Sequence, residues 1–188
     1  MELLTKQMQM LTVKCQAISQ VTFDEDLNVP DVKPDVGRMI QKKGEVLIED
    51  VQISEGAAYI KGELVISLLY VGDSEERRIH SLQGRLPIGE TLHLNGLENG
   101  DKVRLKWEIE DLSLQLINSR KLSVKALVTF MAGVDETGEV RLPIGLVEED
   151  ISQKKQPISV MGLAVHKKDT MRIKEEIALA SNKPNIYE

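Results

Sequence analysis

Apolar and polar residues alternate at a period of two along much of the chain. The longest alternating rows run through residues 57–71, 103–117 and 121–132, and a shorter row holds Leu11, Val13, Cys15 and Ala17. A period of two turns one side of a strand toward a core and the other toward water. We therefore predict a mainly β fold, an antiparallel β-sandwich or barrel-like domain, with one more strand over residues 45–53.

Turn-forming residues separate these predicted strands. They are Glu55-Gly56, Gly72-Asp73-Ser74, Asn99-Gly100-Asp101 and Asn118-Ser119-Arg120. Glycine and asparagine adopt the backbone conformations that tight hairpin turns require. Within 103–117 the apolar phase slips between Ile109 and Leu112, which predicts a β-bulge near Glu110-Asp111.

One short helix is predicted near residues 34–43. Pro34 can occupy a first helical turn, and Asp35 would lie near the positive end of the helix dipole. Gly44 would then end the helix. The apolar residues that would share one helical face are Val36, Met39 and Ile40.

Two phrases of the sequence occur twice. Residues 29–40 are echoed in truncated form at 179–188, which predicts a unit of roughly 150 residues followed by the start of another. We expect residues 1–150 to form a first β domain and 151–188 a connector and the opening strand or strands of a truncated second repeat. Arg85–Gly89 also recurs unchanged as Arg141–Gly145, and its prolines are expected at strand ends or sheet edges, because proline donates no ladder hydrogen bond.

Composition narrows the classes of partner. The net charge of −6 argues against nucleic acid and anionic membranes, which select basic surfaces. No apolar run reaches the roughly 18–20 residues of a membrane span. Cys15 is the single cysteine, so no internal disulfide can form, which suits a reducing, cytoplasmic compartment.

The chemistry-bearing residues form no recognisable catalytic pattern. His80, His93 and His166 lie at no metal-ligand spacing from one another or from Cys15. The acidic cluster around Asp24-Glu25-Asp26 lacks the spacing of a calcium loop, and no glycine-rich phosphate loop occurs. We expect no enzyme activity, no metal, no cofactor and no catalytic residues, and we interpret Trp107 as a core residue in phase with Leu105.

Three segments, in order along the chain, resemble the SPOCS domain, a repeated module of Firmicute sporulation proteins. Pro30-Asp-Val-Lys-Pro-Asp-Val36 resembles the signature that opens that domain. Ile60–Val71 is similar to its central strand, and Leu116–Ala126 to its Asn-Ser-Arg-Lys hairpin strand. The echo at 177–188 resembles the start of another copy.

The resemblance implies a non-catalytic structural or protein-interaction module in spore envelope assembly, acting in the mother-cell cytoplasm at the forespore surface. It also implies tandem SPOCS units with a C-terminal LysM module, and the spore coat morphogenetic ATPase as a protein partner. The alternatives are a carbohydrate- or peptidoglycan-binding module and a hydrolase with a site between repeats. The oligomeric state stays open. We interpret the motif residues as a structural motif that shapes a turn, and not as ligands: Pro30, Asp31, Lys33, Pro34, Asp35, Asn118, Ser119 and Arg120.

Overall fold

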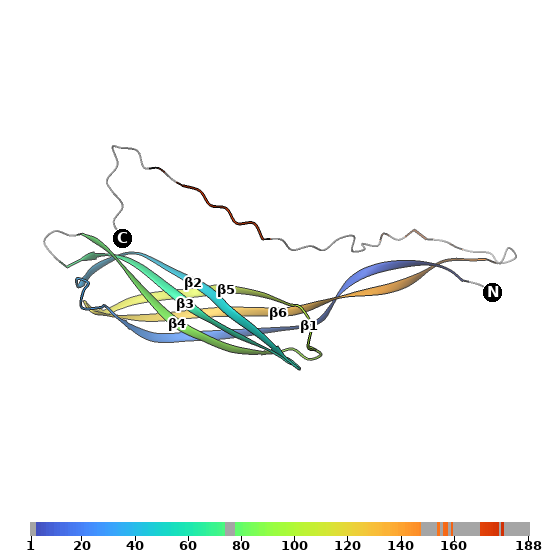
Figure 1. Cartoon of the computed structure of the whole chain (residues 1–188), viewed down its shortest axis with the longest axis horizontal. Coiled ribbons are helices and arrows are strands. Elements are labelled where there is room, and N and C mark those ends of the chain that lie inside the picture. Colours follow the sequence, from blue (N-terminus) through green and yellow to red (C-terminus); the bar gives the residue numbers. More distant parts are fainter. Residues whose placement is uncertain are drawn as a thin grey trace.

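The computed structural model contains six β-strands (Figure 1). It describes residues 3–73, 78–147, 154, 156–157, 159, 170–176 and 178, and no helix occurs among them. The strands are β1 (Leu3–Asn28), β2 (Val36–Ser54), β3 (Ala57–Gly72), β4 (Ile79–His93), β5 (Val103–Asn118) and β6 (Lys121–Leu146). The prediction of a mainly β fold is confirmed.

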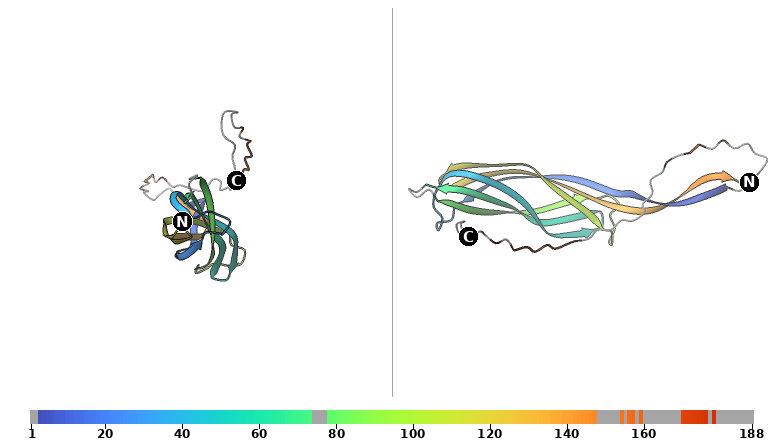
Figure 2. Two further views of the ribbon diagram at one scale, coloured as in Figure 1. Left: turned by 90° about the vertical axis from the view of Figure 1, so that its left-hand side faces the viewer. Right: turned by 90° about the horizontal axis from the view of Figure 1, so that it is seen from above.

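The strands form two antiparallel sheets of three strands. Sheet A has the order β1-β6-β5 and sheet B the order β2-β3-β4. The sheets face each other across one shared hydrophobic core, and the end-on and top views show the two layers (Figure 2). No hydrogen-bonded pairing between the described strands joins sheet A to sheet B, so they do not close into a barrel.

The middle strands β3 and β6 supply most of the core, because each is covered on both sides by neighbouring strands. Tyr70 of β3 and Phe130 of β6 are the largest side chains with no exposed surface. The alternating rows predicted over 57–71 and 121–132 point their apolar residues into this core. Burial of such side chains contributes roughly 1.5–3 kcal/mol each, which makes the two middle strands the main source of stability.

The predicted helix near residues 34–43 is wrong. Residues 31–35 form a turn, and β2 starts at Val36 and pairs with β3. Register shifts at Gly37 and Ile40 each insert one residue into the strand. An inserted residue shifts the alternation by one, so Val36 and Met39 face inward at a spacing of three that imitates a helical face.

Gly44, expected to end that helix, lies in the middle of β2 where this strand crosses β5. A Cβ atom at Gly44 would lie 3.0 Å from the Leu112 side chain and 3.2 Å from that of Ile109. The glycine therefore allows the two sheets to approach closely at this crossing.

Bulges also decide which apolar residues are buried. The predicted bulge near Glu110-Asp111 is confirmed, because the β5–β6 register shifts between Ile109 and Asp111. An unpredicted bulge lies in β1, where the register shifts between Val13 and Cys15. Cys15 is buried as expected, whereas Leu11 and Val13, on the other side of the shift, are 40% and 56% exposed.

Trp107 is 42% exposed, so its assignment to the core is wrong. The predicted face of the strand is correct, because Trp107 pairs with the core residue Phe130 and lies on the same face of sheet A. It is exposed because β5 is an edge strand, and an edge position has a neighbouring strand on one side only.

Beyond the two-layered body, β1 and β6 continue alone as a two-stranded ribbon (Figures 1 and 2). We define the ribbon as Leu3–Val13 paired with Asp135–Leu146. Two ion pairs fix its base: Lys14 Nζ lies 2.9 Å from Asp101 Oδ2, and Arg104 makes two 3.0 Å hydrogen bonds to the Asp135 carboxylate. The ribbon is therefore held in a defined direction on both of its strands.

The repeated Arg-Leu-Pro-Ile-Gly phrase lies on sheet edges in both copies. Pro87 belongs to β4, the edge of sheet B. Pro143 belongs to the ribbon, beyond Val134, the last β6 residue that pairs with β5. The second repeat predicted at 151–188 falls largely outside the described residues, and the echo at 179–188 falls wholly outside them, so both stay predictions.

Candidate functional site

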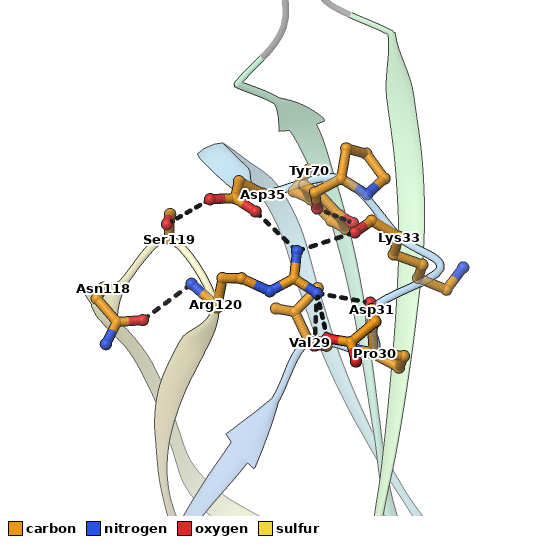
Figure 3. A network of polar contacts seen from close by, with 10 residues as sticks. Val29, Pro30, Asp31, Lys33, Asp35, Tyr70, Asn118, Ser119 and Arg120 are labelled. Carbon is orange, nitrogen blue, oxygen red and sulfur yellow. Dashed lines mark hydrogen bonds and ion pairs between the residues drawn. The ribbon is translucent and has the colours of Figure 1, made fainter.

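The two polar motifs singled out in the sequence meet in one network (Figure 3), at the end of the body opposite the ribbon (Figure 1). One motif lies in the β1–β2 connection, and the other in the tight turn between β5 and β6. Arg120 joins them. We call this cluster the Arg120 junction, and it comprises Val29, Pro30, Asp31, Lys33, Pro34, Asp35, Tyr70, Asn118, Ser119 and Arg120.

The Arg120 guanidinium binds the β1–β2 connection at several points. Its Nη2 donates to the carbonyl oxygens of Val29, at 3.1 Å, and Pro30, at 2.9 Å. Its Nη1 donates to the Lys33 carbonyl, at 3.1 Å, and to Asp35 Oδ1, at 2.7 Å. The planar fork of arginine suits this array of oxygens, whereas a lysine ammonium could not span it.

Asp35 is the anionic partner of this guanidinium. Its second carboxylate oxygen accepts a hydrogen bond of 2.7 Å from the Ser119 hydroxyl. The hydrogen bond from Arg120, then that from Ser119, lower the pKa of Asp35 below its ordinary value, and the Arg120 charge adds to this. The hydrogen bond to Asp35 in turn raises the pKa of Arg120. Both groups are therefore charged at neutral pH.

Tyr70 brings sheet B into the junction. Its ring has no exposed surface, and its hydroxyl donates a 2.9 Å hydrogen bond to the Pro34 carbonyl. Burial raises the pKa of Tyr70, so the phenol stays protonated and remains a donor. Because Tyr70 is on β3 and Arg120 follows β5, the connection between them is held by both sheets.

Backbone hydrogen bonds complete the junction. The Val29 and Val36 amides donate to the carbonyls of Arg120 and Ser119, each at 2.8 Å. The Asp73 amide donates to the Asp35 carbonyl at 2.9 Å. The β1–β2 connection is thus clamped between the β5–β6 turn and the end of β3.

All eight motif residues from the sequence analysis lie in this cluster, in different capacities. Arg120, Asp35 and Ser119 contribute side chains, whereas Pro30, Lys33 and Pro34 contribute carbonyls. Asn118 Oδ1 accepts the Arg120 amide at 2.9 Å, which shapes the β5–β6 turn. The exposed Asp31 carboxylate lies 3.4 Å from Arg120, a peripheral contact. Tyr70 was not predicted as part of this cluster, because its position in an apolar row gives no sign of a polar role.

The junction's polar groups are occupied by one another. No buried side-chain nitrogen or oxygen in the described part of the chain lacks a hydrogen-bond partner. No cluster of three or more potential metal ligands occurs there either. His80 packs beside Tyr70, with ring centroids 5.7 Å apart, and His93 is exposed, while His166 lies outside the described residues. The arrangement holds two sheets and a connection together.

Residues 35–117 match the family model described as SipL, SPOCS domain. These residues are similar to a SPOCS domain. The match runs from the start of β2 through β5, so it covers all of sheet B and one strand of sheet A. The Arg120 junction forms where the matched segment begins and ends, at Asp35 and beside Asn118. No curated protein and no solved structure matches the chain. In the described segments, the structure has no helix of the length and apolar character that a membrane crossing needs.

Proposed function

We propose that this protein is a non-catalytic structural and protein-interaction module in the assembly of the spore envelope, its coat and cortex. The match to the SPOCS domain carries this proposal, because that family suggests a sporulation-related interaction role. The Arg120 junction supports it: the motif's polar groups are used inside the fold, where they fix the relative position of two sheets.

The proposed partner is the spore coat morphogenetic ATPase, met at the forespore surface from the mother-cell cytoplasm. A rigid β body displays loops and strand edges in fixed positions, which is a common way for β domains to bind other proteins. The acidic chain, with a net charge of −6, suits a protein partner better than an anionic polymer or membrane.

A direct binding experiment tests the partner. The purified chain is immobilised and exposed to the purified coat ATPase, and we expect saturable binding. Two variants are measured beside it: Arg120→Lys, which alters the junction, and its matched control Arg85→Lys, which alters a surface ion pair with Glu63. Failure of the folded wild-type chain to retain the ATPase would refute this choice of partner.

A genetic experiment tests the wider role. In-frame deletion of the gene is expected to give spores with defective envelopes, visible by thin-section electron microscopy and by loss of lysozyme resistance. Complementation by the wild-type gene restores both. Normal envelopes in the deletion strain would overturn the proposed function, whatever the binding experiment shows.

A further inference from the structure

The ribbon has one apolar face and one polar face. Residues directly opposite in an antiparallel pair point to the same side. The cross-strand pairs on the first face are Lys6 with Leu142, Met8 with Val140, Met10 with Gly138, and Thr12 with Glu136. The pairs on the second face are Thr5 with Pro143, Gln7 with Arg141, Gln9 with Glu139, Leu11 with Thr137, and Val13 with Asp135. The first face therefore carries an apolar centre, and the second is mostly polar.

The apolar face of the ribbon continues the core face of sheet A. On β6, Ala132 and Val134 point into the core, and the unbroken alternation puts Gly138, Val140 and Leu142 on the same side. On β1, the extra residue Lys14 in the bulge brings the even-numbered residues of the ribbon into line with Cys15.

Sheet B does not extend over this continuation. Among the described residues, the core cluster includes no residue of the ribbon. Val140 is 36% exposed, and Met8, Met10 and Leu142 are half-buried. An isolated two-stranded ribbon is marginally stable in water, and sheets gain stability when an apolar face is covered. Within the described part of the chain, the ribbon therefore has one layer where the body has two.

The charges on the apolar face are self-complementary. Lys6 lies toward the free tip and Glu136 toward the base, with the Met8 and Met10 pairs between them. If a second ribbon is laid face to face in the opposite direction, Lys6 of each copy comes to the same end of the paired face as Glu136 of the other. A Cβ atom at Gly138 would meet nothing within 4 Å, so there is room above it for a methionine side chain.

We propose that the ribbon is a dimerisation element, in which the apolar faces of two copies pack antiparallel about a two-fold axis. Each ribbon then supplies the missing second layer of the other, in line with its partner's sheet B. An interface related by a two-fold axis needs a self-complementary surface. The order of Lys6, Met8, Met10 and Glu136 from the tip to the base of this face meets that need. This inference concerns the chain alone and does not depend on the proposed function.

Self-association of the full chain tests the proposal. Sedimentation equilibrium over a range of concentrations is expected to show a monomer–dimer equilibrium. Val140→Lys places a charge at the centre of the apolar face and should raise the dissociation constant about tenfold or more. Gln9→Lys, the matched control on the opposite face, should leave it within about twofold, since that face stays in water. Circular dichroism checks that both variants keep their strands.

Exchanging the charges of Lys6 and Glu136 distinguishes pairing between two copies from other ways of covering the apolar face of the ribbon. Lys6→Glu and Glu136→Lys should each weaken the dimer about threefold or more, and the double variant should restore it. Within one ribbon these residues are about 20 Å apart along the strands, so only contact with another copy explains restoration. A chain that stays monomeric at all concentrations, or a dimer weakened equally by Val140→Lys and Gln9→Lys, would overturn the proposal. A double variant no better than the singles would overturn the antiparallel geometry.

Discussion

At the scale of single residues, the Arg120 side chain contacts several groups of the Arg120 junction at once. It touches three carbonyl oxygens and two carboxylates, all in the β1–β2 connection. A side chain with this role depends on the shape of its donor group as much as on its charge.

Arg120→Lys should therefore destabilise the fold although the charge is kept. We expect the melting temperature to fall about 5 °C further than for Arg85→Lys. Arg85 is a suitable control because it makes one ion pair with Glu63, at 2.9 Å on the surface. Thermal unfolding followed by circular dichroism measures the difference, and equal melting temperatures for the two variants would contradict the assigned role.

A second prediction concerns the two tyrosines of β3. Tyr70→Phe removes a hydroxyl that donates to Pro34 from a fully buried ring, and should cost about 1 kcal/mol of unfolding free energy. Tyr59→Phe is the matched control, because Tyr59 is 41% exposed and its change should cost nothing measurable. Urea titration measures both. A Tyr70 variant as stable as the wild type would show that the hydrogen bond adds no net stability.

The lowered pKa of Asp35 makes a third prediction, about pH. The ordinary value is 3.8, and the folded value lies below it, so the folded chain binds this proton less tightly than the unfolded chain. The carboxylate therefore stabilises the fold above the ordinary value, and this contribution is lost as the pH falls through the folded value.

Asp35→Asn should lower the melting temperature near neutral pH and flatten its decline below about pH 4. Ser119→Ala removes the hydrogen bond with the smaller effect on the pKa of Asp35 and should give an intermediate profile. Melting temperatures measured between about pH 7 and pH 2.5 test this, and parallel profiles for wild type and Asp35→Asn would be incompatible with it.

At the scale of strands, the sequence pattern predicted strands well and their faces less well. The alternating rows 57–71 and 121–132 form β3 and the buried part of β6. These predictions are correct because the alternation of buried and more exposed residues along a middle strand follows the period of two in the sequence. The bulge in β5 was predictable, since its apolar residues visibly change phase between Ile109 and Leu112.

The other bulges were hidden by the residues around them. In β2, two inserted residues lie close together, and the inward-facing apolar residues are therefore three positions apart. This spacing imitates one face of a helix. In β1, Leu11 and Val13 are apolar although they precede the Lys14 bulge and are exposed. The apolar alternation of the sequence therefore continues across the bulge, whereas the side chains change from one face of the strand to the other. Tyr70 could not be assigned to the Arg120 junction because its partner there is a backbone carbonyl, which leaves no mark in a sequence.

The close pairing of β2 with β3 at Gly62 gives a prediction at this scale. A Cβ atom at Gly62 would lie 2.4 Å from the Leu47 carbonyl oxygen and 3.2 Å from the Ile48 Cα. These are backbone atoms, so Gly62→Ala must displace a strand and should cost about 1–3 kcal/mol. Gly138→Ala, where a Cβ meets nothing within 4 Å, is the control and should leave chemical denaturation of the monomer unchanged. Similar losses in both variants would show that close packing at Gly62 is not the cause.

At the scale of the whole molecule, the two ends of the body differ in what holds them. The Arg120 junction fastens one end by contacts from both sheets, whereas the other end continues into a ribbon with a single layer. Local stability follows the amount of packing around a segment, so the ends should open at different rates.

Hydrogen exchange of the backbone amides measures this difference. In dilute solution, where the proposed dimer dissociates, amides of the ribbon should exchange much faster than those of β3, whose side chains form the core. Raising the protein concentration should slow exchange in Leu3–Val13 and Asp135–Leu146 and leave β3 unchanged, because only the ribbon gains a covering layer. In Val140→Lys the ribbon should exchange rapidly at every concentration, while Gln9→Lys should behave as wild type. Strong protection of the ribbon in the dilute monomer would mean that its apolar face is already covered within one chain, and that the layer it lacks is supplied without a second copy.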